Sequence, residues 1–84
     1  MAHNLKSWSW VYEDVAVKGT KTFEIRKHDR NFQVGDLVVF YEVADGEYTG
    51  LKSKPFIITY LLTHKQFPQG LQFGYCAFGI KPHE

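Results

Sequence analysis

The sequence predicts an α+β domain, a small β-barrel of about five mostly antiparallel strands with one N-terminal helix. The chain has 84 residues, which is the size of a single domain (residues 1–84) with a thin core. Hydrophobic residues make up 44% and aromatic residues 17%, so large rings can fill that core. Near the N-terminus one group of apolar residues has the spacing of a helix, and in the rest of the chain apolar residues alternate with a period of two. A twisted sheet in so small a protein protects its edges best by curling into a barrel.

The first two elements are a short strand near residues 4–7 and a helix over residues 9–18. Ser9 can cap the start of this helix, and Gly19 can supply the left-handed residue that ends it. A helix this short is not stable alone, so it must pack on the sheet. Its apolar stripe consists of Trp8, Val11, Tyr12 and Val15.

From Thr22 onward the period changes to two. Phe23 and Ile25 are expected to face the core, with Thr22, Glu24 and Arg26 on the opposite face. The later strands are "LVVFYEVA", expected to be buried on both faces, "FIITYLLTH" and "YCAFGI". Turns are predicted at Gly35-Asp36 and Asp45-Gly46, and a loop over residues 65–74. The predicted core comprises Phe23, Ile25, Leu37, Val39, Ile58, Tyr60 and Phe78.

Several classes of protein and site do not fit the composition. Cys76 is the single cysteine, which excludes an internal disulfide and a cysteine-based zinc site and suits a reducing compartment. The N-terminus does not resemble a signal peptide, and no apolar run approaches about 18 residues. The four histidines lack ligand-like spacing, and the common catalytic signatures are missing. We therefore expect a soluble cytoplasmic protein with no membrane partner, metal or cofactor.

Charge is unevenly distributed along the chain, although the net charge is only +1. Residues 18–30 carry five basic and two acidic side chains, whereas residues 31–50 carry four acidic side chains and no Lys or Arg. Such asymmetry suits an anionic ligand. The alternative is a pair of solvated faces with no ligand, and composition alone does not choose between them.

The stretch "GTKTFEIR" holds the most informative group of polar residues. In one interpretation its polar face lines a groove, where the Arg26 fork contacts phosphate or carboxylate, Glu24 holds that fork and Lys21 reaches the ligand. In the other, Glu24 and Arg26 form an exposed ion pair, which contributes only about 0–1 kcal/mol. The spacing of these residues in the sequence does not choose between the two interpretations.

The same stretch matches the G-x-K-x-x-E-x-R signature of ASCH domains, which belong to the PUA-like superfamily of small β-barrels. From about His3 to Ile80, and most specifically through "HDRNFQVGD", the chain resembles a short ASCH-like family of bacteria and phages whose function is uncharacterised. His28 stands where that family usually has Asn. The resemblance implies a PUA-like barrel with a cleft beside the helix that binds RNA, a nucleotide or a modified nucleoside.

The candidate ligand-binding residues come from two sources. Lys21, Glu24 and Arg26 are carried over from the family motif. The others are added on charge or on stacking ability, with Phe32 as an alternative ring. They are Lys18, Lys27, His28, Arg30 and Trp10.

Two other functions remain open. One ASCH-related branch hydrolyses the amide of an acetylated cytidine with a Lys, a Thr and an acid, but Glu24 occupies the Thr position here and residues 63–74 contain no acid. We therefore predict no deacylation of N4-acetylcytidine, although a Lys21–Glu24 pair suits other acid–base chemistry such as RNA cleavage. The third possibility is a protein-interaction domain.

Overall fold

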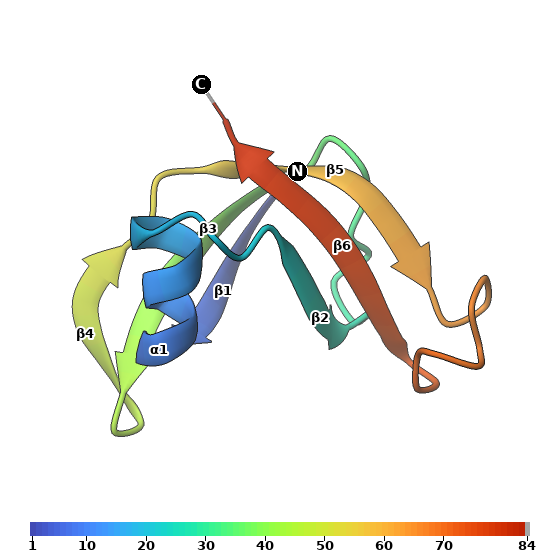
Figure 1. Ribbon diagram of the computed structural model, residues 1–84, viewed down its shortest axis with the longest axis horizontal. Helices are drawn as coiled ribbons and strands as arrows, with labels where there is room; N and C mark the ends of the chain where they lie inside the picture. Colours follow the sequence, from blue (N-terminus) through green and yellow to red (C-terminus); the bar gives the residue numbers. More distant parts are fainter. Residues whose placement is uncertain (84) are drawn as a thin grey trace.

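Residues 1–83 form six strands and one short helical segment (Figure 1). The computed structural model describes residues 1–83. This architecture confirms the predicted α+β class. The elements are β1 (Ala2–Trp8), α1 (Ser9–Tyr12), η1 (Glu13–Val17), β2 (Phe23–Lys27), β3 (Leu37–Ala44), β4 (Glu47–Lys52), β5 (Phe56–Thr63) and β6 (Tyr75–Pro82).

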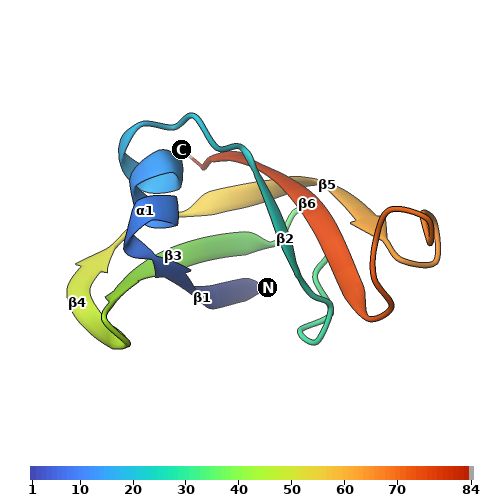
Figure 2. The ribbon, with the colours of Figure 1, turned by 60° about the horizontal axis from the view of Figure 1, so that its bottom comes forward.

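The six strands form one sheet in the order β1-β3-β5-β6-β2, with β4 paired to β3 outside this path. β1 and β3 run parallel, and the other pairs are antiparallel. The sheet curls into a half-barrel with β1 and β2 as its two ends (Figure 2). β4 is additional to the five predicted strands. It returns along β3 because Asp45 and Gly46 both have positive φ, 51° and 79°, as a two-residue hairpin turn requires.

The helical segment covers residues 9–17, close to the prediction, but its second half is π-helical. Tyr12 and Val15 are buried as expected. Trp8 is not part of the buried stripe: it ends β1 and is 66% exposed. Ser9 is not the cap either, since it is the first helical residue and the segment begins without a side-chain cap. Gly19 has the predicted left-handed conformation, with φ of 68°.

The side chains of β2 alternate as predicted but face the opposite way. Phe23 and Ile25 are 52% and 58% exposed, whereas Glu24 is 3% exposed and faces the inside of the half-barrel. Two cationic side chains neutralise Glu24 there, so its burial does not leave an unpaired charge. Phe23 and Ile25 are therefore not core residues.

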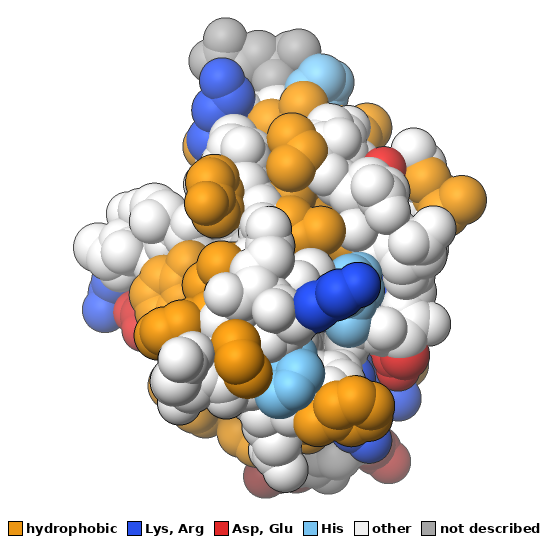
Figure 3. Space-filling view, turned by 90° about the vertical axis from the view of Figure 1, so that its right-hand side faces the viewer, with side chains coloured by type: hydrophobic (Ala, Val, Ile, Leu, Met, Phe, Trp, Pro, Cys, Tyr) orange, Lys and Arg blue, Asp and Glu red, His pale blue; other side chains and the backbone are white. Residues whose placement is uncertain are grey.

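In the remaining predicted core, Ile58 and Phe78 are buried as expected. Tyr60 was expected inside but is 65% exposed. A register shift between Ile58 and Tyr60 interrupts the alternation of β5, so Tyr60 joins the outer face. Hydrophobic side chains are also visible on the side where the loop between β5 and β6 lies (Figure 3).

β3 is buried on one face rather than two. Val38 and Phe40 are fully buried, whereas the predicted core residues Leu37 and Val39 are only half-buried. The buried apolar side chains of β3 therefore lie on the inner face of the half-barrel. The buried apolar cluster consists of Leu5, Tyr12, Val15, Phe32, Val38, Phe40, Phe56, Ile58, Cys76, Phe78 and Ile80.

The predicted turn at Gly35-Asp36 attaches the loop after β2 to the start of β1. Gly35 has φ of 94°, and Asp36 is buried. The Asp36 carboxylate lies 2.8 Å from His3 Nε2 and accepts a hydrogen bond from the Gln33 amide. Burial acts to raise the pKa of Asp36, but these hydrogen bonds and the Met1 amine, 3.3 Å from Oδ1, together outweigh it, so the pKa is lowered.

Within residues 1–83, no helix has the length and apolar character needed to span a bilayer.

Candidate functional site

β1 and β2 lie at the two ends of the sheet and are joined by side chains instead of a strand ladder. Arg26 Nη2 donates to the Lys6 carbonyl at 2.7 Å, and Arg30 Nη1 donates to the Asn4 carbonyl at 2.9 Å. These are both arginines of the chain. We call this junction the seam. Because no ladder fills it, the seam leaves room for a cavity.

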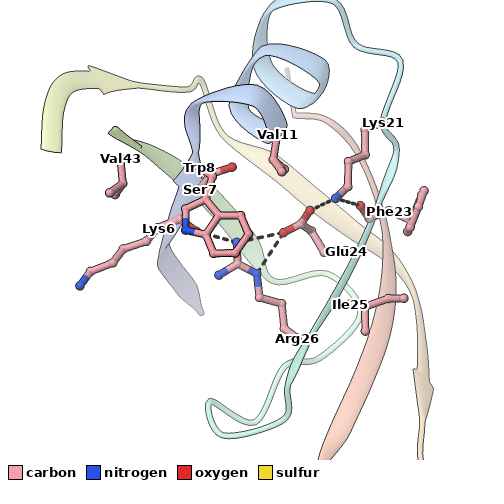
Figure 4. A pocket seen from close by; sticks show the side chains of 10 residues that line it. All are labelled: Lys6, Ser7, Trp8, Val11, Lys21, Phe23, Glu24, Ile25, Arg26 and Val43. Atoms are coloured by element: carbon pink, nitrogen blue, oxygen red, sulfur yellow. Dashed lines mark hydrogen bonds and ion pairs between the residues drawn. The ribbon is translucent and has the colours of Figure 1, made fainter. Parts of the chain in front are cut away.

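A cavity of about 530 Å³ opens at the seam (Figure 4). Its walls come from the end of β1, from Val11 of α1, from Val43 of β3 and from the segment 21–26. We call it the seam pocket. Most of the lining is apolar; Lys21, Glu24 and Arg26 lie on the β2 side, and Lys6 and Ser7 belong to β1.

Glu24 organises these polar groups. Its side chain is 4% exposed and forms an ion pair with Lys21 through Oε2. Its other oxygen, Oε1, accepts a hydrogen bond from Arg26 Nε at 3.0 Å and forms an ion pair with Arg26 Nη2 at 2.9 Å. Lys21 Nζ also donates to the Phe23 carbonyl at 2.6 Å. The three side chains that the motif predicts therefore converge, with a formal charge of +1.

The local sequence explains this convergence. After Gly19 turns the chain out of the helix, the Lys21 amide donates to the Asp14 carbonyl at 3.1 Å, which fixes the start of the segment. Glu24 and Arg26 are two residues apart in a strand and so share one face. Pairing of β2 with β6 places that face toward the inside of the half-barrel.

The sequence interpretation did not identify the lining residues outside the motif, and Ser7 and Trp8 of β1 are the most informative of them. Ser7 is 3% exposed, and its Oγ has no hydrogen-bond partner within the described residues. Trp8, assigned to the buried stripe, instead lines the pocket with an exposed ring. The signal that would have found Ser7 is the alternation of buried positions in β1, at His3, Leu5 and Ser7, once that strand is extended to Trp8.

None of the other five candidates lines the seam pocket. Trp10 is 66% exposed, and its ring centroid is 6.2 Å from that of Trp8. Lys27 is exposed on the outer face of β2. Lys18 lines a separate cavity of about 260 Å³ beyond the helix, which Lys21 also borders.

The loop after β2 has structural contacts. His28 packs nearly parallel to Phe32, and its buried Nε2 has no partner among the described residues. Arg30 holds the seam through the Asn4 carbonyl. Phe32 is 1% exposed, so it cannot be the exposed stacking ring that was considered. The candidates that were added because of their charge or stacking ability thus do not gather at the seam pocket in the folded chain.

The seam pocket offers a defined set of contacts to a ligand. Lys21 and Arg26 supply cationic donors, and Glu24 holds both of them in place. Trp8 and Val11 add apolar surface. This combination fits a planar polar ring that carries an anionic group.

A protein of Escherichia phage P2, described as "Uncharacterized 12.9 kDa protein in GpA 3'region", is similar to part of this chain. The two are 42% identical over 41 residues. That match covers 49% of this chain and 38% of the phage protein's length. A family model described as "Domain of unknown function (DUF3850)" matches residues 2–80, which include the whole seam pocket. The chain therefore belongs to this family, the Domain of unknown function (DUF3850).

Proposed function

We propose that the seam pocket binds a nucleotide, either free or as one unit of single-stranded RNA. The observation that carries this proposal is the convergence of Lys21, Glu24 and Arg26 beside the buried, unpartnered Ser7 Oγ. Lys21 and Arg26 face the phosphate, and Trp8 contacts the base.

The size and lining of the pocket support this class of ligand. About 530 Å³ lies within the range of small-molecule sites, roughly 300–1,000 Å³, which combine apolar walls with a few placed polar groups. The resemblance of "GTKTFEIR" to the ASCH signature supports the same ligand class. It also supports a place for this half-barrel in the PUA-like superfamily.

The arrangement of Glu24 favours binding over catalysis. Both of its oxygens already accept hydrogen bonds from cationic donors, so its role is to orient Lys21 and Arg26. A general base needs an oxygen free to accept a proton from the substrate. Glu24 also stands at the position where the amide-hydrolysing ASCH branch has its Thr.

Lys21→Ala is the most direct test of the phosphate contact, because Arg26 also holds the seam. Fluorescence anisotropy with a short single-stranded RNA at several salt concentrations should show weaker binding. The slope of log affinity against log salt should become shallower by about one unit, since one phosphate contact is lost.

Lys52→Ala is the matched control, because Lys52 is exposed on β4, away from the pocket. Its affinity and salt slope should stay close to those of the unsubstituted protein. If a folded Lys21→Ala variant kept both, the pocket would not be the phosphate-binding site.

A further inference from the structure

The outward-facing residues of β2, β6 and β5 form a second distinctive surface. Strand pairing aligns them in rows across the three strands. Phe23, Gly79 and Tyr60 form the first row, and Ile25, Ala77 and Leu62 the second; Lys27 and Tyr75 begin a third. We call this surface the outer face. It is continuous with the seam pocket, because Phe23 and Ile25 also line that pocket.

Large apolar side chains are exposed on the outer face, with Phe23, Ile25 and Tyr60 each more than half accessible. A contiguous apolar surface of this kind usually marks an interaction site. Gly79 leaves a gap between the Phe23 and Tyr60 rings, whose strands are about 10 Å apart at two strand spacings. A Cβ at position 79 would lie 3.2 Å from Thr59 Oγ1 and 3.8 Å from Tyr60 Cβ. Glycine thus keeps the space between the rings open.

The charged side chains that the three strands direct outward are lysines. Lys27 and Lys81 point outward, and the Lys21 ammonium lies 4.9 Å from the centroid of the Phe23 ring. Glu24 is the only carboxylate in the three strands, and it faces inward. Two copies packed through this face would oppose lysines to lysines with no carboxylate between them. A polyanion would neutralise them instead.

We propose that the outer face is a stacking platform for single-stranded nucleic acid. Bases stack on Phe23 and Tyr60, and phosphates run past Lys27 and Lys81. The proposal shares the ligand class of the proposed function but concerns a different surface, so each can fail without the other. Bases that follow the nucleotide in the seam pocket reach this platform across Phe23.

Tyr60→Ala tests the platform. The variant removes a ring that is 65% exposed, so it should fold normally, as a thermal unfolding curve will show. A single-stranded RNA of about ten nucleotides, the scale of a single-stranded binding site, should bind about fivefold or more weakly, the loss of one stacked base. Uridine monophosphate, which reaches only the pocket, should bind unchanged. Tyr60→Phe should retain the affinity for the longer RNA, because the ring remains.

Tyr48→Ala is the matched control, since Tyr48 is 60% exposed on β4 and away from the outer face. Its affinity for both probes should not change. Unchanged affinity of Tyr60→Ala for the longer RNA would overturn the platform while leaving the pocket intact. Platform-dependent binding of the longer RNA, with no binding of uridine monophosphate and no change in Trp8 fluorescence with either probe, would overturn the proposed function alone. Concentration-dependent dimers in sedimentation that Tyr60→Ala abolishes would assign the face to a second copy and overturn the platform.

Discussion

At the scale of single residues, Glu24 departs most clearly from ordinary strand chemistry. A carboxylate takes an inner position of β2, while Phe23 and Ile25 face outward. Burying a carboxylate is costly unless cationic donors pair with it, and here Lys21 and Arg26 both do. Departures of this kind concentrate at functional sites, where a binding geometry outweighs local packing rules.

Glu24→Gln separates an orienting role from direct contact with a base. Gln keeps the shape of the side chain and removes a negative charge near the expected phosphate. We expect RNA affinity to stay equal or rise, and the free energy of unfolding to fall by about 1–3 kcal/mol because charged hydrogen bonds are weakened. Anisotropy with four RNAs that differ in one base, together with urea unfolding, measures both quantities.

The control for this experiment is Glu47→Gln, an exposed acidic residue on β4. It should change neither the affinity nor the stability by a measurable amount. If Glu24→Gln instead reduced the discrimination between bases, Glu24 would be a direct acceptor from the ligand and the orienting role would be wrong.

At the scale of elements, the junction of β1 and β2 determines where the pocket lies. The half-barrel ends in two strands that no ladder joins, and Arg26 and Arg30 connect them to each other. Arg26 therefore has two tasks, since it also contacts Glu24. Among the described contacts, Arg30 only connects the two strands and does not line the pocket. A substitution of Arg30 therefore tests the seam without altering the pocket.

Arg30→Ala should weaken the seam. The Asn4 carbonyl loses a charged donor that is partly accessible to water, so the free energy of unfolding should fall by about 1 kcal/mol. Urea unfolding measures this loss, and hydrogen exchange should be faster for the amides of β1. Lys27→Ala, on the outer face of the same region, should leave both unchanged. Equal stability of Arg30→Ala and the unsubstituted protein would mean that the arginine contacts do not hold the seam.

The sequence predicts elements better than it predicts which way they face. The period of β2, the helix end at Gly19 and the Asp45-Gly46 turn depend on local chemistry and are confirmed. Alternation, however, looks the same whichever face is buried, so Glu24 and Phe23 were assigned to the wrong sides.

Tertiary pairing accounts for the other differences. Tyr60 faces outward because of a register shift against β6, which no local pattern in β5 reveals. The family motif identified Lys21, Glu24 and Arg26, which do converge. Ser7 and Trp8 enter the site from β1, a strand far from the motif in sequence, so the motif could not indicate them.

At the scale of the whole molecule, the basic and acidic segments have different structural positions. The pocket and the seam use Lys21, Arg26 and Arg30 from the basic segment. Of the acidic residues in 31–50, Asp36 is buried, and Glu42, Asp45 and Glu47 lie on the hairpin of β3 and β4 (Figure 1). A polyanion approaching the molecule would be attracted to the seam and repelled from this hairpin.

The two tryptophans offer the most direct test of the claim that the seam pocket binds a nucleotide. Trp8 lines the pocket and Trp10 does not. The Trp10→Phe variant therefore keeps only Trp8, inside the site, and the Trp8→Phe variant keeps only Trp10, beside the site. Titration with uridine and cytidine monophosphate should quench the Trp8 emission of the Trp10→Phe variant in a saturable way, because the base contacts that ring. The Trp10 emission of the Trp8→Phe variant should change little. No saturable change in Trp8 emission with either nucleotide, or an equal change in both variants, would contradict binding in the seam pocket.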